Sequence, residues 1–174
     1  MTDTVSQPEI REVNRIVVRF AGDSGDGMQL TGERFTSASA LFGNDLATLP
    51  EFPAEIRAPQ GTLAGVSAFQ VQVSDHDITT PGDAPNVLVA MNPAALKKEL
   101  SKLEEAGTII VNRDTFEERN LKKAGYEDNP LETGELSGYT LFEVPMTSLT
   151  KEVCKGIEGI KPRDAERSKN FFAL

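Results

Sequence analysis

The hydrophobic positions near the N-terminus form a strand pattern followed by a helix pattern. Residues 16–21 are an apolar run rich in β-branched side chains that stops at Gly22, which predicts a buried strand. After a glycine-rich segment, apolar residues recur at roughly helical spacing from Met28 to Leu41, and a cluster of helix-breaking residues follows at 42–45. The pattern predicts a strand, a glycine turn and a helix, in that order.

Short apolar runs and helical patterns alternate along the rest of the chain. Residues 46–53 have the length of a strand but contain two prolines, so we expect an edge strand at best. Residues 66–73 alternate between apolar and polar side chains and predict a strand with one wetter face. Further strands are predicted at 86–91, 108–111 and 139–144, and further helices at 93–106, 113–124 and 147–154. This alternation is typical of an α/β fold, and we expect a three-layer α/β/α domain with a mostly parallel or mixed central sheet.

The segments outside these elements differ in character. Residues 1–13 are polar and are interpreted as a flexible lead-in, so the folded domain is expected over 14–174. The segment 51–65 is long for a connector, mixes proline with glycine, and carries Arg57 as its only cation, which favours a functional loop. The acidic, turn-rich segment 125–138 is expected to be a solvated loop.

The composition disfavours several classes of function. The chain has 174 residues, a net charge of −9 and a pI near 4.7, which disfavours binding to nucleic acids or to anionic membranes. No apolar stretch reaches the roughly 18 to 20 residues that a membrane-spanning helix needs, and the polar N-terminus shows no secretory signal. The single cysteine, Cys154, excludes an internal disulfide framework and any iron–sulfur or zinc site that needs several cysteines. A cytoplasmic protein is the simplest interpretation.

The glycine turn 22–27 is the main candidate for a binding site. A strand, a tight turn and a helix point the free N–H groups of the helix's first turn above the sheet, where a phosphate is the usual guest. Asp23 and Asp26 complicate this interpretation, because a carboxylate near a helix N-terminus can cap the helix itself. The residues alone leave two hypotheses open: an anion site, or a self-capped turn without a ligand.

Two cofactor motifs resemble this turn but are incomplete. The dinucleotide fingerprint needs a Gly-x-Gly-x-x-Gly spacing, and Ser24 stands where its middle glycine should be. The sequence at 25–27, Gly-Asp-Gly, resembles the magnesium-binding motif of thiamine diphosphate enzymes, which a later asparagine completes. Asn44 is too close to complete it and Asn86 is too far away. Direct binding of a dinucleotide, or of thiamine diphosphate with magnesium, is therefore disfavoured.

The remaining reactive side chains give no catalytic pattern. His76, the only histidine, lies between Asp75 and Asp77 in a polar turn, where a solvated surface histidine is expected. Cys154 is interpreted as a structural, half-buried thiol on a helix. No nucleophile elbow is present, because the glycine turn has an aspartate where that motif has serine. We therefore expect no catalytic residue and no metal ligand in this chain.

Four stretches of the sequence carry a family resemblance: RIVVRFAGDSGDGMQLTGERF, GNDLATLPEFPAEIRAPQGTLAGVSAFQVQVS, DITTPGDAPNVLVAMNPAAL and GTIIVN. Together they resemble the γ-type domain of 2-oxoacid:ferredoxin oxidoreductases. They look most like the version at the N-terminus of the α subunit of 2-oxoglutarate:ferredoxin oxidoreductase. The resemblance extends from about Asn14 to Leu174. In this family the final FFAL continues into a further helix, so the chain is expected to be truncated at its C-terminus.

The resemblance implies a role within a larger enzyme. The complete enzyme would oxidatively decarboxylate a 2-oxoacid with coenzyme A and pass electrons through [4Fe-4S] clusters to ferredoxin. Thiamine diphosphate, magnesium and the clusters would be held by other parts of that enzyme and not by this chain. The implied partners are the remainder of the α subunit, the β subunit and, through the complex, ferredoxin. The isolated chain is expected to be catalytically inactive.

The resemblance also assigns a site to the glycine turn. The family's glycine loop lies near the nucleotide and pyrophosphate end of coenzyme A, and Arg57 becomes a plausible phosphate partner. The implied cofactor-binding residues are Gly22, Asp23, Ser24, Gly25, Asp26, Gly27, Met28, Gln29 and Arg57. The alternative is a non-catalytic α/β scaffold or a nucleotide-binding domain, in which the glycine turn is only a tight connection.

Overall fold

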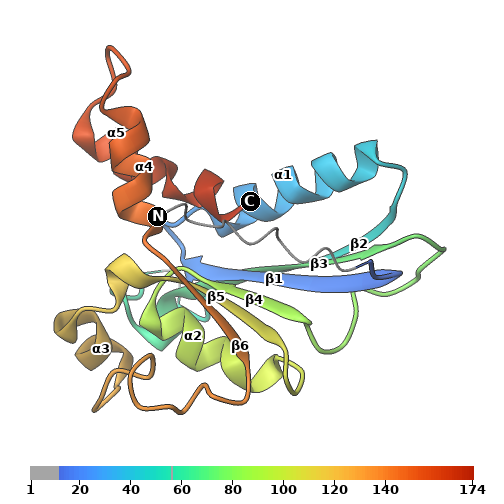
Figure 1. The fold of residues 1–174 in the computed structure, drawn as a ribbon, viewed down its shortest axis with the longest axis horizontal. Coiled ribbons are helices and arrows are strands. Elements are labelled where there is room, and N and C mark those ends of the chain that lie inside the picture. The colour runs from blue at the N-terminus through green and yellow to red at the C-terminus, as the bar shows by residue number, and fades with distance from the viewer. Residues whose placement is uncertain (1–11, 56) are drawn as a thin grey trace, which may run out of the picture.

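The computed structural model describes residues 12–55 and 57–174 and contains one six-stranded mixed sheet (Figure 1). The strands lie in the order β2-β3-β1-β4-β5-β6. Strand β3 is antiparallel to both β1 and β2, whereas β4, β5 and β6 continue parallel to β1. The strands are β1 (Arg15–Asp23), β2 (Asp45–Glu51), β3 (Val66–Ser74), β4 (Val87–Ala90), β5 (Thr108–Asn112) and β6 (Thr140–Val144).

Helices cover both faces of the sheet, which gives the expected three layers (Figure 1). The helices are α1 (Met28–Leu41), α2 (Pro93–Glu99), α3 (Glu118–Ala124), α4 (Met146–Cys154) and α5 (Pro162–Arg167). Short 3-10 helices are η1 (Leu63–Gly65), η2 (Leu100–Lys102), η3 (Arg113–Thr115) and η4 (Ser168–Ala173). Helix α1 and the C-terminal η4 lie over one face, and α2 and α3 lie over the other. The α/β prediction is confirmed.

Each face of the sheet has its own hydrophobic core. On the α1 face, Phe20 of β1 packs with Met28 and makes an edge-to-face contact with Phe35, with ring centroids 5.4 Å apart. On the α2 face, Leu96 of α2 packs against the strands together with Ile109 of β5. Strand β1 is buried on both faces and lies inside the sheet, although Arg19 interrupts its apolar sequence.

The edge-strand prediction for the proline-containing segment is confirmed, because β2 is one edge of the sheet. Two helix predictions were too long. The segment 93–106 is an α-helix only to Glu99 before it tightens into η2, and the segment 113–124 is divided into η3 and α3. The second break lies at Phe116, whose ψ of 46° leaves the helical region while its side chain enters the core.

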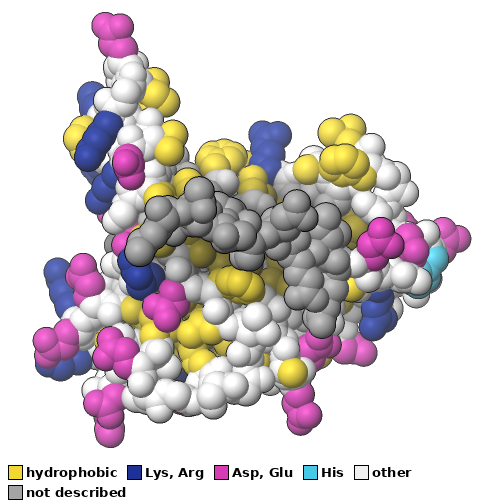
Figure 2. Space-filling view, in the orientation of Figure 1, with side chains coloured by type: hydrophobic (Ala, Val, Ile, Leu, Met, Phe, Trp, Pro, Cys, Tyr) yellow, Lys and Arg dark blue, Asp and Glu magenta, His cyan; other side chains and the backbone are white. Residues whose placement is uncertain are grey.

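Helical spacing located α1 but not its burial. Among the apolar residues at its C-terminal end, Leu41 is 89 % exposed and Phe42 is 85 % exposed. Figure 2 shows hydrophobic side chains gathered at this end of the helix. The close contact with the sheet is made instead at Gly32, where α1 packs against Phe69 of β3.

The chain ends differ from what the sequence pattern suggested. The helix predicted to begin in the last residues is the 3-10 helix η4, and α5 before it had not been predicted. Most of the flexible lead-in predicted for residues 1–13 lies outside the described residues, as does Ile56 in the loop after β2. Among the described helices, none has both the length and the apolarity to cross a bilayer.

Candidate functional site

A cleft of about 510 Å³ opens at the carboxyl ends of β1 and β4. These two strands are parallel neighbours, but the chain leaves β1 into α1 on one face and leaves β4 into α2 on the other face. Such a divergence leaves a crevice above the strand ends, where open α/β sheets bind their ligands. The lining residues are Asp23, Gly25, Asp26, Gln60, Gly61, Met91, Asn92, Pro93, Thr115, Asn120, Lys123, Arg163, Glu166, Arg167 and Lys169.

Asn92 joins the two strand ends at the floor of the cleft. Its side-chain oxygen accepts a hydrogen bond from the Ala95 N–H at 2.8 Å, and Pro93 follows at the first helical position, so Asn92 caps α2. Its Nδ2 donates to Asp26 Oδ2 at 3.4 Å. The start of α2 is thereby tied to the glycine turn.

The glycine turn is stabilised by the side chain of Asp26, which folds back on the turn. Asp26 Oδ2 accepts the Asp23 N–H at 3.0 Å, and Asp26 Oδ1 lies 3.0 Å from Lys169 Nζ. Helix α1 then begins after Gly27, whose φ of 75° favours glycine and which makes no side-chain cap. The carboxylate therefore stabilises the turn itself and does not cap the helix.

Some amides of the turn remain available to a ligand. The N–H of Ser24 donates to Gly65 O at 3.3 Å, and that of Asp26 donates to Asp23 O at 2.9 Å. Among the described residues, the N–H groups of Gly25 and Gly27 have no hydrogen-bond acceptor. Gly25 lines the cleft directly. The turn is thus partly self-satisfied and partly open, which combines the two hypotheses drawn from the sequence.

Asp23 connects the turn with the loop before β3. Its Oδ2 accepts the Gly61 N–H at 2.9 Å, while its Oδ1 is buried without a hydrogen-bond partner in the described part of the chain. Burial raises the pKa of Asp23 above its ordinary value, and the nearby charge of Asp26 raises it further. Asp23 therefore holds the rim of the cleft in place at an electrostatic cost.

Four cations line the cleft. They are Lys123 of α3, Arg163 and Arg167 of α5, and Lys169 of η4. Figure 2 shows Lys and Arg side chains over α4 and α5. Lys169 is paired with Asp26, but neither arginine has a carboxylate within 4.0 Å among the described residues. Guanidinium groups without a carboxylate partner suit a ligand with phosphate groups, since a phosphate can take two of their N–H donors at once.

The predicted site residues divide into three groups. Asp23, Gly25 and Asp26 line the cleft. Gly22 and Gly27 contribute backbone next to the cleft but do not line it. An added Cβ at Gly22 would meet Asp26 and Met91 atoms at 3.0–3.1 Å, and an added Cβ at Gly27 would meet Asn170.

The remaining predicted side chains point elsewhere or do not line the cleft. Met28 is buried in the core, and Gln29 donates to Glu51 O and Ala68 O, at 3.2 and 3.0 Å. Ser24 and Arg57 are exposed, and neither is among the residues that line the cleft. The loop that contains Arg57 contributes Gln60 and Gly61 instead.

Sequence reasoning missed the C-terminal cations and the polar residues after β4 and β5. The basic residues between 161 and 169 form a local cluster that could have been noticed by charge alone. Asn92 and Thr115 follow parallel strands, and the carboxyl ends of such strands meet at one edge of a sheet. That rule could have placed them near the glycine turn.

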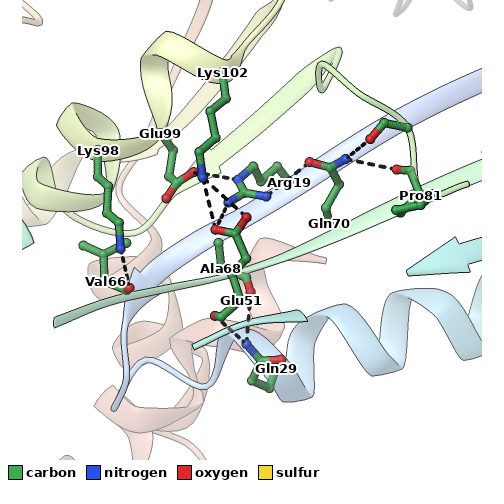
Figure 3. Close-up of polar contacts among 11 residues, drawn as sticks. Arg19, Gln29, Glu51, Val66, Ala68, Gln70, Pro81, Lys98, Glu99 and Lys102 are labelled. Atoms are coloured by element: carbon green, nitrogen blue, oxygen red, sulfur yellow. Dashed lines mark hydrogen bonds and ion pairs between the residues drawn. The ribbon is translucent and has the colours of Figure 1, made fainter. Parts of the chain in front are cut away.

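A second polar cluster lies outside the cleft (Figure 3). Arg19 Nε lies 2.7 Å from Glu99 Oε2, and the guanidinium also contacts Glu51 and Gln70. Burial would raise the pKa of Glu51, but Lys102 and Arg19 outweigh burial, and the pKa lies below its ordinary value. These contacts fasten β2 and α2 to β1, so the cluster is structural.

The other reactive side chains are placed as expected. His76 is 61 % exposed, with Nδ1 2.8 Å from Asp75 Oδ1, which confirms a solvated histidine. Cys154 is half-buried near the end of α4. In the part of the chain that the structure describes, no group of three His, Cys, Asp or Glu side chains is arranged to hold a metal ion.

The sequence matches the family described as pyruvate ferredoxin/flavodoxin oxidoreductase over residues 17–174. It is 60 % identical over 167 residues to 2-oxoglutarate oxidoreductase subunit KorA of Mycobacterium tuberculosis, which covers 96 % of this chain and 25 % of that protein. It is 31 % identical over 137 residues to 2-oxoglutarate synthase subunit KorC of Methanothermobacter marburgensis, and this match covers 78 % of the present chain and 66 % of KorC. The chain thus spans about a quarter of the length of KorA.

Solved structures share the fold. The 2-oxoglutarate:ferredoxin oxidoreductase from Magnetococcus marinus, solved with 2-oxoglutarate, coenzyme A and succinyl-CoA bound, superposes with a TM-score of 0.67 and 26 % identity, covering 94 % of this chain and 24 % of that chain. The γ subunit of a keto/oxoacid ferredoxin oxidoreductase from Geobacter sulfurreducens PCA superposes with a TM-score of 0.60 at 18 % identity. This match covers 91 % of the present chain and 71 % of that γ subunit. The second likeness shows the fold alone.

Proposed function

The chain belongs to the pyruvate ferredoxin/flavodoxin oxidoreductase family, and on that premise we propose that its cleft between β1 and β4 binds coenzyme A within a 2-oxoglutarate:ferredoxin oxidoreductase. The observation that carries the proposal is the cleft itself, which is lined by Gly25 and by two arginines that have no carboxylate partner among the described residues. Coenzyme A bears a pyrophosphate and a further phosphate on its ribose. The likeness to an enzyme solved with coenzyme A bound adds support.

In the proposed reaction the complete enzyme removes carbon dioxide from 2-oxoglutarate and joins the succinyl group to the thiol of coenzyme A. The two electrons released pass to ferredoxin. The residues of this chain do not fit the redox and carbanion-stabilising cofactors, because a [4Fe-4S] cluster needs several cysteine ligands and the sequence has one cysteine. Thiamine diphosphate, magnesium and the clusters therefore belong to other parts of the enzyme in this proposal.

The contribution of the chain is binding and orientation. Gly25 lines the cleft and its N–H has no acceptor among the described residues, so it would offer a donor to an anion, as strand–helix turns do. Arg163, Arg167 and Lys123 would supply positive charge to the cleft, and Asn120 would add a neutral donor. Together they would fix the nucleotide end of coenzyme A so that its thiol end reaches a reaction centre elsewhere. No proton or electron transfer by this chain is needed.

The proposal also names partners and a location. The other domains of the same subunit, a β-type subunit and, through the complex, ferredoxin are the proposed partners, since relatives of this chain are subunits of such oxidoreductases. A cytoplasmic location is proposed with them. The alternative is that this domain serves assembly only and leaves coenzyme A to other domains.

Substituting Gly25 separates these two functions. An added Cβ at Gly25 meets only Gln60 Nε2 at 3.4 Å, so Gly25→Leu fits the backbone and fills the cleft. In the assembled complex, we expect the KM for coenzyme A to rise roughly tenfold or more, while kcat at saturating coenzyme A and subunit assembly are retained. Gly138→Ala, at a site with nothing within 4 Å of the added Cβ, is the control. An unchanged KM in Gly25→Leu would favour the assembly-only alternative.

A further inference from the structure

We infer that Asp26 is a positioning residue that holds the C-terminal segment 162–173 against the glycine turn through Lys169. The placement of this segment determines where Arg163 and Arg167 lie in the cleft. The inference rests on the proposed binding of coenzyme A at this site, and it identifies what adjusts the affinity there. It also explains why an acidic side chain lies in a cleft that is suited to phosphates.

The carboxylate of Asp26 is fully engaged by groups of this chain. Its Oδ1 pairs with Lys169 Nζ at 3.0 Å, and its Oδ2 accepts from the Asp23 N–H at 3.0 Å and from Asn92 Nδ2 at 3.4 Å. The side chains of Asp26 and Lys169 are only 13 % and 16 % exposed. An ion pair that is this well shielded is screened less by solvent than a surface pair and holds its two elements together more firmly.

The residues next to Lys169 continue the contact with the turn. Asn170 is buried, and its backbone oxygen accepts a hydrogen bond from Thr31 Oγ1 of α1 at 3.3 Å, across 139 residues of sequence. Its side-chain amide lies so close to Gly27 that an added Cβ there would be 2.7 Å from Nδ2. Ala173 packs at the edge of the core on the α1 face. The segment is therefore attached at the first turn of α1.

The segment also packs against α4, through both α5 and η4. Residues 155–161, which lead into it, are all exposed. Within α5, Ala165 is buried, and the Lys151–Glu166 ion pair is about half exposed on both sides, where such pairs contribute little. The Asp26–Lys169 pair is thus a fastening of the segment to the glycine turn, away from α4. Because Arg163 and Arg167 line the cleft from α5, their positions depend on this fastening.

A direct electrostatic role of Asp26 would have the opposite sign. If its charge acted mainly on the ligand, it would repel the phosphates, and Asp26→Asn would tighten the binding of coenzyme A. If Asp26 acts through Lys169, the same substitution releases the segment and weakens binding. Asparagine keeps the shape of the side chain and one acceptor for the Asp23 N–H, so the turn itself can persist.

The test uses the complete oxidoreductase complex with Asp26→Asn, Lys169→Met and the conservative Lys169→Arg. We expect Asp26→Asn and Lys169→Met to increase amide hydrogen exchange across 162–173 without coenzyme A, and to raise the KM for coenzyme A roughly tenfold at unchanged kcat. Lys169→Arg should restore both values. Glu118→Gln breaks an exposed lysine pair outside the cleft and should change neither.

The possible results are distinct. Unchanged exchange across 162–173 in both Asp26→Asn and Lys169→Met, or a KM that stays constant or falls in Asp26→Asn, would overturn the positioning role. Lys169→Met leaves the Asp26 contacts to Asp23 and Asn92 in place, so it reports on the segment even if Asp26→Asn does not assemble.

Arg163→Gln is measured alongside these variants. If it weakens coenzyme A binding while Asp26→Asn does not, the proposed function stands and this inference fails. If neither Arg163→Gln nor Gly25→Leu affects coenzyme A, the proposed function itself fails.

Discussion

Arg19 and Glu99 lie 80 residues apart in the sequence and form a buried ion pair, with Arg19 Nε 2.7 Å from Glu99 Oε2 and side-chain exposures of 1 % and 0 %. The pair joins the central strand β1 to α2, and Glu51 and Lys102 extend it to the edge strand β2 (Figure 3). Strand β1 ends at the cleft, and helix α2 begins there. The pair therefore supports the floor of the site from below.

Removing one member of this pair should destabilise the fold severely. Arg19→Met leaves Glu99 without its guanidinium partner, and we expect the free energy of unfolding to fall by about 3–5 kcal/mol. In the double variant Arg19→Met/Glu99→Leu no unpaired charge is left between β1 and α2, so much of that loss should be recovered. Urea unfolding followed by circular dichroism measures both. Glu99 keeps its ion pair with Lys102 in Arg19→Met. A double variant no more stable than Arg19→Met would show that the loss does not come from the missing guanidinium partner of Glu99.

Gly32→Ala should destabilise the protein although alanine is the better helix former. A Cβ at Gly32 would lie 2.1 Å from Cδ1 of Phe69, so α1 would have to move away from β3. Helix propensity alone favours alanine by about 1 kcal/mol, whereas overpacking costs about 1–3 kcal/mol and should dominate. Thermal unfolding of Gly32→Ala, and of Gly32→Ala/Phe69→Leu, measures the effect. The smaller side chain at 69 should restore part of the stability, and a Gly32→Ala variant more stable than the parent would contradict the packing.

The buried carboxyl of Asp23 should make stability fall as pH rises. Its pKa is raised in the folded state above the ordinary 3.8 by burial and by Asp26, so the folded state binds the proton more tightly than the unfolded state. The contribution of Asp23 is most favourable below pH 3.8 and is lost as pH rises through its raised pKa. Asp23→Asn keeps an acceptor for the Gly61 N–H but cannot ionise.

The comparison is the difference in unfolding free energy between Asp23→Asn and the parent across this pH range. We expect the unfolding free energy of Asp23→Asn to increase relative to that of the parent as pH rises from about 4 towards neutrality. Other carboxyl groups, which both proteins share, cancel in the difference. A difference that is flat with pH would mean that Asp23 titrates normally in the folded protein.

The isolated chain should not turn over 2-oxoglutarate. A [4Fe-4S] cluster needs several cysteine ligands and the sequence has one cysteine, so we expect the chain alone to transfer no electrons from a 2-oxoacid to ferredoxin. The measurement is dye or ferredoxin reduction by the purified chain with 2-oxoglutarate and coenzyme A. Activity without the other subunits would refute the division of labour proposed here. A yellow preparation with a flavin spectrum would instead point to an independent flavoprotein.

Much of the fold could be predicted because its signals are local. The β-branched run of β1 and the helical spacing of α1 each depend on neighbouring residues, and Pro50 restricts its strand to an edge wherever the rest of the chain lies. The antiparallel insertion of β3 between β1 and β2 has no such signal. Its alternating sequence fits either direction, and strand direction is decided by which neighbours are available.

The candidate site was only half predictable for the same reason. The glycine turn could be predicted from Gly22, Gly25 and Gly27, since glycines after a strand are typical of a tight turn. The family resemblance implied Arg57 as a phosphate partner, but Arg57 does not line the cleft. The cations that do line it include Arg163 and Arg167, which no spacing rule connects with a turn so far away.

The sequence by itself determined the order of the six strands and of helices α1 to α4, the tight turn after β1, the membership of the family and the lack of a cysteine set for redox clusters. Only the tertiary structure decided that Asp26 pairs with Lys169, that Arg19 is buried against Glu99, and that α5 lies over the strand ends. The physical reason is range. Periodicity and turn chemistry act between adjacent residues, whereas a charge pair needs two side chains to meet in space, and chain packing alone brings them together.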